Sequence, residues 1–539
     1  MLTSTVSLLN GKLDQNMSRL QAPAIGIWGL GIVGWSVLRY LTRLRQLEHS
    51  GQIVGAAWPA VVPITATIVV CEQRALTARE LAQLQTLGVQ VTADVAQFLQ
   101  QCDRIIPSPG VDLHPYQAHQ VKFLSELDLF YAGFSQPILA VTGSLGKTTI
   151  TTMISELLTK LGYRVGVGGN IGVGMCDLIE QQADLDLAVL ELSSFQLEAA
   201  QQLRAQWALW TNFYPNHLDR HADLTAYFAA KLQLILNQQA VDIGILPADL
   251  CTTALSTLKQ VSATAVNNAS VRHDAQLAAE VPGVKLTGSN HLASQLSCFS
   301  LARPTHLMSA GQLVAPLQGA YYVHDQVIVR EQGGVITPLV TWAQLSAQTM
   351  LINWVAIVAL LDRLVVDSRL KQLGTQNWPT MLVTYQFGGV PHRLELCQEW
   401  QGVKFYNDSK STVPEATLAA LASLRAQPVI LLLGGLSKGV HRENLLAQLR
   451  QFTQLKAVIC FGAEAVQLQQ WGAQYQLPVT APAADLAAAL TLAQAAAQAG
   501  DCVLFSPAGS SFDLFPNYQA RGEAFKRLVR ERASSATAL

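Results

Sequence analysis

The segment Pro137–Leu158, PILAVTGSLGKTTITTMISELL, decides the fold of the middle of this chain. Its apolar start, PILAV, predicts a buried strand, and the spaced apolar residues after Lys147 predict a helix. Between them lies a short phosphate-loop pattern, GxxGKTT. Glycines allow backbone N–H groups to point at phosphate oxygens, and a helix N-terminus adds partial positive charge. The segment therefore predicts a nucleotide site; the alternative is an ordinary glycine-rich turn.

Candidate catalytic groups lie on this loop and after two later strands. The loop consists of Gly143, Ser144, Leu145, Gly146, Lys147, Thr148 and Thr149. We expect Lys147 on the β- and γ-phosphates and Thr148 on Mg²⁺. Glu191 ends the apolar run AVLE, where a carboxylate can bind the same cation; the alternative is a capping or surface glutamate. His217 follows the run WALWTN at the same sheet edge, although a lone histidine near a turn is more often structural.

The strand–glycine–helix unit occurs twice more, as AIGIW–GLGIVG from Ala24 and as VILLL–GGLSKG from Val429. Apolar strands alternating with helices predict parallel sheets covered by helices. We expect an α/β chain with a Rossmann-like N-terminal domain, a central P-loop ATPase domain with a parallel sheet, and a Rossmann-like C-terminal domain. The expected borders are 1–132, with 1–22 as a tail, 133–386 and 387–539. Residues 240–340 are less regular and end in a predicted hairpin, YYVHDQVIV–REQGG–VITPL.

The N-terminal motif GLGIVG, residues 29–34, indicates a second ligand site. A dinucleotide site needs an acidic residue at the end of the second strand, usually about 20 residues further on. The candidate here, Glu72, lies well beyond that spacing. The motif therefore predicts a cradle for a diphosphate, and it leaves open whether the ligand is NAD, as in an oxidoreductase, or another nucleotide.

Composition excludes several classes of protein. The 539 residues carry 36 Lys+Arg and 37 Asp+Glu, a net charge of −1, which argues against nucleic-acid binding. The longest uncharged stretch, residues 53–71, contains two prolines and ends like a strand, so we expect no membrane span. The N-terminus has no signal-peptide pattern. The eight scattered cysteines form no CxxC pair, which argues against disulfides and zinc and for the cytoplasm.

The motifs taken together resemble the Mur ligases. The similarity runs from GLGIVG almost to the C-terminus, through IIPSPGV, SELDLF, TGSLGKTT, VGVGGNIGVG, ELSSFQLE, HLDRH, AAKL, VPHRLEL, NDSKST, LLLGG–SKG and LFSPAGSSFDLFPNYQARG. Within the family it is strongest to members that add D-glutamate to UDP-N-acetylmuramoyl-L-alanine. The resemblance implies a cytoplasmic, ATP-dependent amide ligase of peptidoglycan precursor synthesis that works through an acyl phosphate, and we expect a monomer.

The resemblance also assigns roles to residues. Lys147, Glu191, His217 and Lys231 fall on catalytic positions, and Thr148, Glu191 and His217 on ligands of two expected Mg²⁺ ions. Lys231, which by itself reads as a helix-surface lysine, falls on a lysine that CO₂ carbamylates and that then serves the metal. The UDP-substrate positions are Gly29, Leu30, Gly31, Glu72 and Asn170; further ATP positions are Asn353, Arg393 and Asp408; glutamate positions are Lys410, Thr412, Lys438, Ser511 and Tyr518.

Several positions depart from the family pattern. Ser144-Leu145 and Val413 stand where asparagine is common, and Thr349 and Met350 replace polar residues. These departures keep two alternatives open. One is a ligase for L-glutamate or another Mur-type substrate, and the other is a catalytically impaired nucleotide-binding paralogue.

Overall fold

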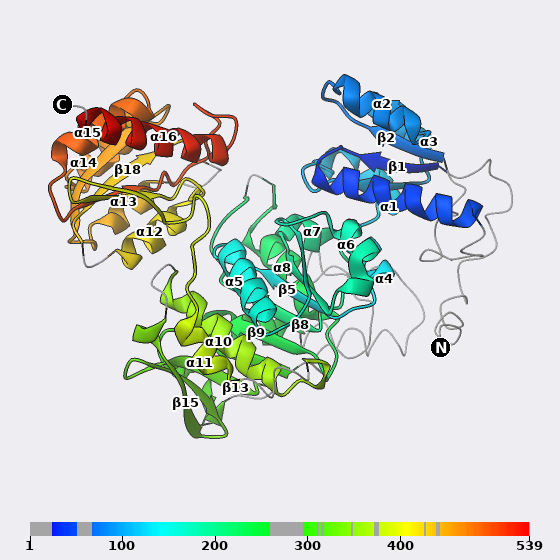
Figure 1. Cartoon of the computed structure of the whole chain (residues 1–539), viewed down its shortest axis with the longest axis horizontal. Coiled ribbons are helices and arrows are strands. Elements are labelled where there is room, and N and C mark those ends of the chain that lie inside the picture. Colours follow the sequence, from blue (N-terminus) through cyan, green and yellow to red (C-terminus); the bar gives the residue numbers. More distant parts are fainter. Residues whose placement is uncertain are drawn as a thin grey trace.

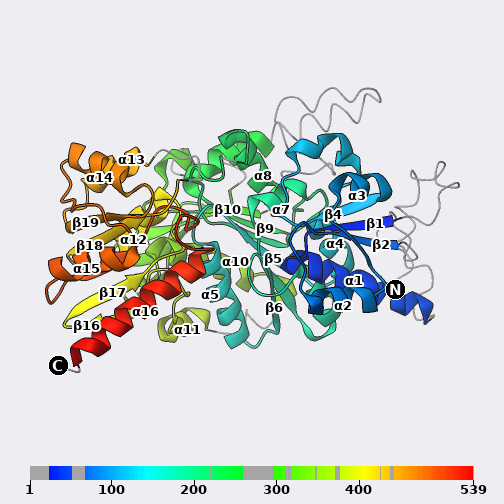
Figure 2. The same cartoon turned by 90° about the horizontal axis from the view of Figure 1, so that it is seen from above.

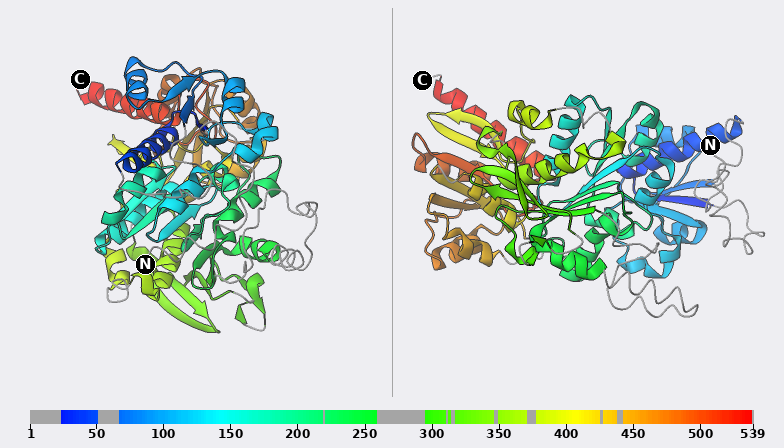
Figure 3. Two further views of the ribbon diagram at one scale, coloured as in Figure 1. Left: turned by 90° about the vertical axis from the view of Figure 1, so that its right-hand side faces the viewer. Right: turned by 90° about the horizontal axis from the view of Figure 1, so that it is seen from below.

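A computed structural model of the chain describes residues 24–50, 67–218, 220–258, 295–309, 312–313, 317–345, 349–370, 377–424, 427–437 and 442–537. The predicted tail and most of the stretch 53–71 lie outside these residues. In the described part, three sheets organise three units, which we call the N-terminal, central and C-terminal units. Figures 2 and 3 show them in a row, with the central unit between the other two.

The N-terminal unit is a small parallel sheet with strand order β3-β2-β1-β4. Its elements are β1 (Ala24–Trp28), α1 (Ile32–His49), β2 (Thr67–Cys71), α2 (Ala78–Thr86), β3 (Gln90–Thr92), α3 (Val95–Gln101) and β4 (Arg104–Pro107). The strands β1 and β4 run side by side, so the loop after β1 and the loop after β4 emerge at one edge. This is the Rossmann-like arrangement that the sequence predicted.

The central unit contains a sheet of order β15-β14-β13-β10-β9-β8-β5-β7-β6. Its strands are β5 (Ile138–Thr142), β6 (Val165–Gly169), β7 (Leu187–Glu191), β8 (Trp207–Trp210), β9 (Ile243–Pro247), β10 (Gln295–Phe299), β13 (Gly319–His324), β14 (Val327–Gln332) and β15 (Val335–Thr341). Its helices include α4 (Glu126–Gly133), α5 (Lys147–Lys160), α6 (Met175–Gln181), α7 (Ser194–Ala199), α8 (Leu224–Leu236), α10 (Leu351–Val365) and α11 (Trp378–Thr384).

The predicted parallel sheet is right for the centre of this unit, but β14 and β15 run antiparallel at one edge, so the sheet is mixed. The predicted hairpin is a three-stranded meander in which β13 turns at Asp325–Gln326 before β14 turns at Gly333–Gly334. Figure 1 shows this meander projecting at the bottom of the central unit. The strand β5 is wholly buried between β7 and β8, so its carboxyl end opens at the middle of the sheet.

Side chains of β5 alternate between two cores because the sheet is covered on both faces. Leu139 and Val141 face a core with α5 and the buried helix α10, whereas Ile138 and Ala140 face the core that extends to α6 and α8. The second core continues into the N-terminal unit, where α1 packs against α6. Burial on both faces explains why the segment reads as a continuous apolar run.

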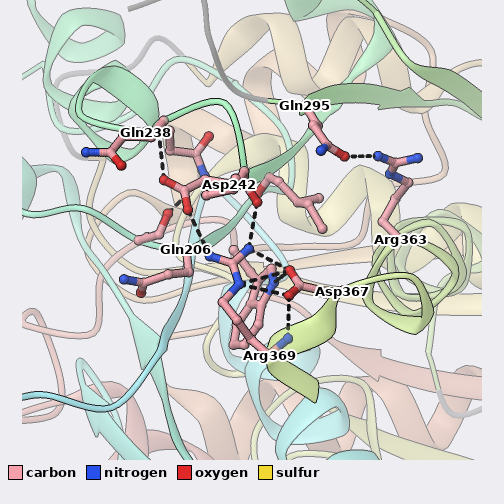
Figure 4. A network of polar contacts seen from close by, with 12 residues as sticks. Gln206, Gln238, Asp242, Gln295, Arg363, Asp367 and Arg369 are labelled. Atoms are coloured by element: carbon pink, nitrogen blue, oxygen red, sulfur yellow. Dashed lines mark hydrogen bonds and ion pairs between the residues drawn. The ribbon is translucent and has the colours of Figure 1, made fainter. Parts of the chain in front are cut away.

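A buried ionic network fixes the chain beyond α10 to β8 (Figure 4). The fully buried Asp242 carboxylate accepts from Arg204 at 2.7 Å and from Arg369 at 2.9 Å. Asp367 accepts from Arg369 and from the Trp207 indole N–H at 2.8 Å. Each charge is paired, which buried charges require.

The C-terminal unit has strand order β16-β17-β20-β18-β19, parallel except for the edge strand β16. Its elements are β16 (Glu395–Trp400), β17 (Val403–Asn407), α12 (Pro414–Ser423), β18 (Val429–Gly434), α13 (Glu443–Leu449), β19 (Leu455–Phe461), α14 (Ala465–Gln474), α15 (Leu486–Ala496), β20 (Cys502–Phe505) and α16 (Tyr518–Thr537). The helix α16 begins beside the central unit and runs outward (Figure 2).

Two further features concern the part of the chain that is described. No described helix combines the length and apolar character that a membrane crossing requires. All eight cysteines are free thiols, and seven of them are buried.

Candidate active site

The phosphate loop lies at the carboxyl end of β5 and requires glycine at two points. Gly143 has φ 146° and Gly146 has φ 79°, which L side chains rarely adopt. A Cβ on Gly143 would lie 2.0 Å from the Thr211 hydroxyl. The helix α5 then begins at Lys147, so its first-turn N–H groups and positive dipole end face the loop's opening.

Asn212, just after β8, braces the loop from the neighbouring strand. Its side-chain oxygen accepts from the Leu145 N–H at 2.8 Å, and its carbonyl accepts from the Ser144 N–H at 3.1 Å. These two amides are therefore already satisfied, which leaves the α5 N-terminus as the anion-binding part of the loop. Asn212 was not among the predicted site residues, although its place after the apolar run WALW puts it at the right sheet edge.

Two lysines converge on the carbonyl oxygen of Gly143. The Nζ atom of Lys147 donates to it at 2.7 Å, and that of Lys231, from α8, at 3.0 Å. Lys231 is 1% exposed, so its interpretation as a helix-surface lysine is wrong. Burial lowers the pKa of Lys147 to about 8. Burial, and then the charge of Lys147, lower the pKa of Lys231 well below its ordinary value.

Glu191 ends β7 beside this pair, and it is 3% exposed. Its Oε2 atom is buried without a hydrogen-bond partner, and its charge acts on both Lys147 and Lys410. A buried, unpartnered carboxylate oxygen needs a cation or a donor to offset its desolvation. The alternative of a capping or surface glutamate is therefore wrong.

His217 lies in a strained turn after β8. Its φ of 57° is uncommon for a residue other than glycine, and its carbonyl accepts from the N–H groups of Arg220 and His221. Its ring packs edge-on against Phe195 at 4.9 Å between centroids. Asn170 follows β6 and donates its N–H to the Glu191 carbonyl at 2.9 Å. Among the described residues, no three His, Cys, Asp or Glu side chains cluster as a ready-made metal site.

The C-terminal unit reaches the phosphate loop through Lys410. Its Nζ atom donates to the Thr148 hydroxyl at 2.8 Å and lies 5.4 Å from the centre of the Tyr518 ring. Burial, with the nearby charge of Arg393, lowers the pKa of Lys410 to about 7. A glutamate-position lysine thus contacts the expected magnesium-position threonine, which joins the two units at the site.

A cavity between the central and C-terminal units adjoins the loop. Its wall includes six of the predicted ATP residues: Leu145, Gly146, Thr149, Asn353, Arg393 and Asp408. Asp408 accepts from Ser411, Ser506 and the Leu394 N–H, while burial raises its pKa to about 6. Two departures from the family pattern meet here, because Leu145 packs with Val413 and Ala416 across the boundary. A third, Thr349, accepts from the Asn353 amide at 2.8 Å.

Two buried arginines that the sequence analysis missed shape the predicted glutamate site. Arg521 donates to the carbonyls of Ser409 and Gly509, and Arg442 donates to those of Gly434 and Gly435. They hold together the loops that carry the remaining positions. Of these, Ser511 is buried and Thr412 is half-buried, both near the carboxyl ends of strands. Lys438 lies outside the described residues.

The N-terminal glycine loop is built as a cradle, but its acidic partner turns inward. Gly29 has φ 89°, and a Cβ on Gly34 would meet the Gly29 carbonyl oxygen at 1.9 Å. Glu72 accepts from the Leu30 N–H at 2.7 Å, so that amide is already occupied. Gly31 faces open space, because nothing lies within 4 Å of a Cβ there. Room for a ligand therefore remains at Gly31 and the start of α1.

Comparison with known proteins agrees with this architecture. Residues 141–297 match the family model of the Mur ligase middle domain, and residues 392–509 match that of the Mur ligase, glutamate ligase domain. The UDP-N-acetylmuramoylalanine--D-glutamate ligase of Desulfitobacterium hafniense (strain Y51) is 32% identical over 491 residues, which are 88% of this chain and 94% of that relative. The enzyme of the same name from Chromohalobacter salexigens is 31% identical, over 95% of this chain and 98% of its own.

Among solved structures, crystal structure II of MurF from Acinetobacter baumannii matches 92% of this chain and 98% of its own, with a TM-score of 0.51 and 15% identity. That likeness concerns the fold alone. The chain belongs to the Mur ligase family.

Proposed function

We propose that this protein is an ATP-dependent ligase that joins D-glutamate to UDP-N-acetylmuramoyl-L-alanine in cytoplasmic peptidoglycan precursor synthesis. The relatives named UDP-N-acetylmuramoylalanine--D-glutamate ligase support this choice of substrates. The observation that carries the proposal is the 2.8 Å hydrogen bond from Lys410 to Thr148, since it joins a glutamate-position residue to the phosphate loop. We also infer that the protein acts as a monomer.

The chemistry has two steps. A carboxylate oxygen of the alanyl group attacks the γ-phosphorus of ATP; the bond to the β-phosphate oxygen breaks, which releases ADP and leaves an acyl phosphate. The amino nitrogen of glutamate then attacks the acyl carbon, an N–C bond forms, phosphate leaves and the nitrogen loses a proton. Lys147 and the α5 N-terminus stabilise the negative charge on the transferred group.

The residues present fit Mg²⁺ at this position. The unpartnered Oε2 atom of Glu191 is a hard anionic ligand, and Thr148 adds a hydroxyl in the first turn of α5. Mg²⁺ is usually held by one or two carboxylates together with substrate phosphates and water, so a cluster of three protein ligands is not needed. When bound, the metal neutralises phosphate charge during transfer. We assign His217 and a modified Lys231 to a second cation.

Lys231 has the environment that carbamylation needs. A neutral amine nitrogen can bond to the carbon of CO₂ and release one proton, giving a carbamate anion. Burial and the neighbouring Lys147 favour that neutral amine. The carbamate would place an anion next to the Lys147 ammonium, and opposite charges attract.

The glutamate site is assigned to Lys410, Thr412, Lys438, Ser511 and Tyr518, and the UDP-substrate site to the glycine cradle at Gly31 with Glu72 and Asn170. The cavity beside Leu145 and Asn353 is assigned to the nucleotide. Contact between the units at the loop keeps water from the acyl phosphate.

The test is phosphate release from ATP by the purified full chain, with Mg²⁺ and bicarbonate present. We expect release only when UDP-N-acetylmuramoyl-L-alanine and D-glutamate are both added. ATP binding without release under these conditions would overturn the proposal in favour of an impaired paralogue. Binding of NAD(H) in calorimetry would favour an oxidoreductase, which rests on GLGIVG alone.

A further inference from the structure

An arginine from the central unit forms two hydrogen bonds to the loop that follows β4 of the N-terminal unit. The guanidinium of Arg220 donates through Nη1 to the Pro109 carbonyl at 2.7 Å and through Nη2 to the Val111 carbonyl at 2.8 Å. These are charge-assisted bonds in a fork geometry that lysine cannot reproduce. Arg220 therefore ties residues 107–111 to the turn that carries His217.

The same guanidinium lies over an aromatic ring that contacts two histidines. Its Cζ atom lies 4.3 Å from the centre of the Phe195 ring. That ring meets His217 edge-on at 4.9 Å and stacks on His221 at 5.4 Å. The His217 carbonyl also accepts from the Arg220 N–H. The loop of one unit and the imidazole of another are thus connected through two side chains, Arg220 and Phe195.

This contact borders a cavity between the two units. Pro107, Ser125, Phe195 and Arg220 line it, and the same four residues line a second cavity together with Ser108 and Pro109. Ser108 donates to the Gly29 carbonyl at 3.0 Å, so the gripped loop also touches the glycine cradle. Movement of residues 107–111 would therefore change both the cradle and the cavity.

We propose that Arg220 is a positioning residue that couples the 107–111 loop, on the UDP-substrate side, to His217 beside the phosphate loop. This inference rests on the proposed function for its substrate. Because of this coupling, the 107–111 loop becomes ordered and the His217 imidazole is placed at the same time. Arg220 contacts no reacting atom.

The chain offers a matched control. Arg39, on α1, also bridges the N-terminal and central units, through a two-pronged ion pair with Asp177 at 2.9 and 2.7 Å. It touches neither the 107–111 loop nor Phe195. Loss of Arg39 therefore removes a contact between the same units without breaking the proposed connection.

The experiment compares Arg220→Ala, Arg220→Lys and Arg39→Ala. For Arg220→Ala we expect the KM for UDP-N-acetylmuramoyl-L-alanine to rise about tenfold or more, because two charged hydrogen bonds are lost. The KM values for ATP and glutamate should change less than about twofold. The KM of Arg220→Lys for the UDP substrate should lie between those of the parent protein and Arg220→Ala. Added guanidinium should partly lower the KM of Arg220→Ala. Arg39→Ala should have the KM values of the parent protein.

Hydrogen exchange of the substrate-free proteins gives a second readout that needs no activity. In Arg220→Ala, amides of both 105–111 and 212–221 should exchange faster, whereas Arg39→Ala should leave both unchanged. An unchanged KM for the UDP substrate, an equal rise in all three KM values, or faster exchange in only one segment would overturn the coupling. If Arg220→Ala does not fold, Arg220→Lys is judged by the same criteria. If the parent protein itself shows no turnover, the proposed function fails and the exchange measurement alone decides the coupling.

Discussion

Lys147 and Lys231 donate to one oxygen, the carbonyl of Gly143, at 2.7 and 3.0 Å. Two ammonium groups so close, with Lys231 fully buried, cannot both hold a proton without a large cost. Burial and Lys147 both lower the pKa of Lys231, whereas the charge of Glu191 raises the pKa of Lys147 against the effect of burial. The pair thus divides into a cation, Lys147, and a neutral amine, Lys231.

Replacement of that amine should abolish most activity. We expect Lys231→Ala to lower kcat at least about a hundredfold, since an electrostatic group of the active site typically contributes that much. Added formate or acetate should restore part of the rate by supplying a carboxylate. Lys160→Ala, an exposed lysine at the other end of α5, is the control and should keep full activity. Full activity of Lys231→Ala without additives would contradict the carbamate assignment.

Nucleotide affinity should fall at alkaline pH. In the free protein Lys147 has a pKa of about 8, lowered by burial, so above that pH it must regain a proton before it can bind phosphate. We expect the affinity for a non-hydrolysable ATP analogue, measured by calorimetry, to be constant below pH 8 and to weaken above it, approaching tenfold per pH unit. Lys147→Arg should shift this weakening upward, because arginine stays charged. A pH-independent affinity in the parent protein would contradict the assignment, and Lys147→Ala should show no turnover.

The apolar contact of Leu145 with Val413 and Ala416 should stabilise the closed arrangement of the central and C-terminal units. Leu145→Asn buries an amide where a leucine side chain packs, at a cost of about 1–3 kcal/mol. We expect the KM values for ATP and glutamate to rise together by about tenfold, as measured by steady-state ADP release. Leu145→Met conserves volume and should stay near the parent values. A rise confined to ATP would mean that Leu145 serves the nucleotide alone.

Stability of the central unit should depend on Asp242. Its loss leaves Arg204 and Arg369 without their shared buried carboxylate, so Asp242→Asn should destabilise the fold by about 3–5 kcal/mol. Thermal unfolding followed by tryptophan fluorescence, which senses the buried Trp207, measures this effect. Arg527→Ala breaks the exposed pair with Glu531 and should cost less than about 1 kcal/mol. Equal shifts in the two variants would show that the network is not structural.

Much of the fold follows from local patterns. The strand β5 is apolar on both faces, which predicts a buried strand. The loop after it needs positive φ angles at Gly143 and Gly146, and glycine at these two positions predicts the phosphate loop. The position of Lys231 beside the phosphate loop could not be predicted from the residues alone, because the helix around it is apolar on most sides and its pattern does not say which face meets the loop. The grip of Arg220 on Pro109 joins residues far apart in sequence, and nothing local marks it. Contacts between units, such as Lys410 to Thr148, were not predicted, because they join loops of separate sheets that are far apart in sequence.

The most direct test of the proposed reaction is the identity of the amino acid that the protein adds. The purified full chain is given ATP, Mg²⁺, bicarbonate and UDP-N-acetylmuramoyl-L-alanine, with equal amounts of unlabelled D-glutamate and ¹³C-labelled L-glutamate. Mass spectrometry of the UDP-linked product then reads the enantiomer directly. We predict that the product carries unlabelled glutamate. A product carrying the label, or no product while ATP still binds, would contradict D-glutamate ligation.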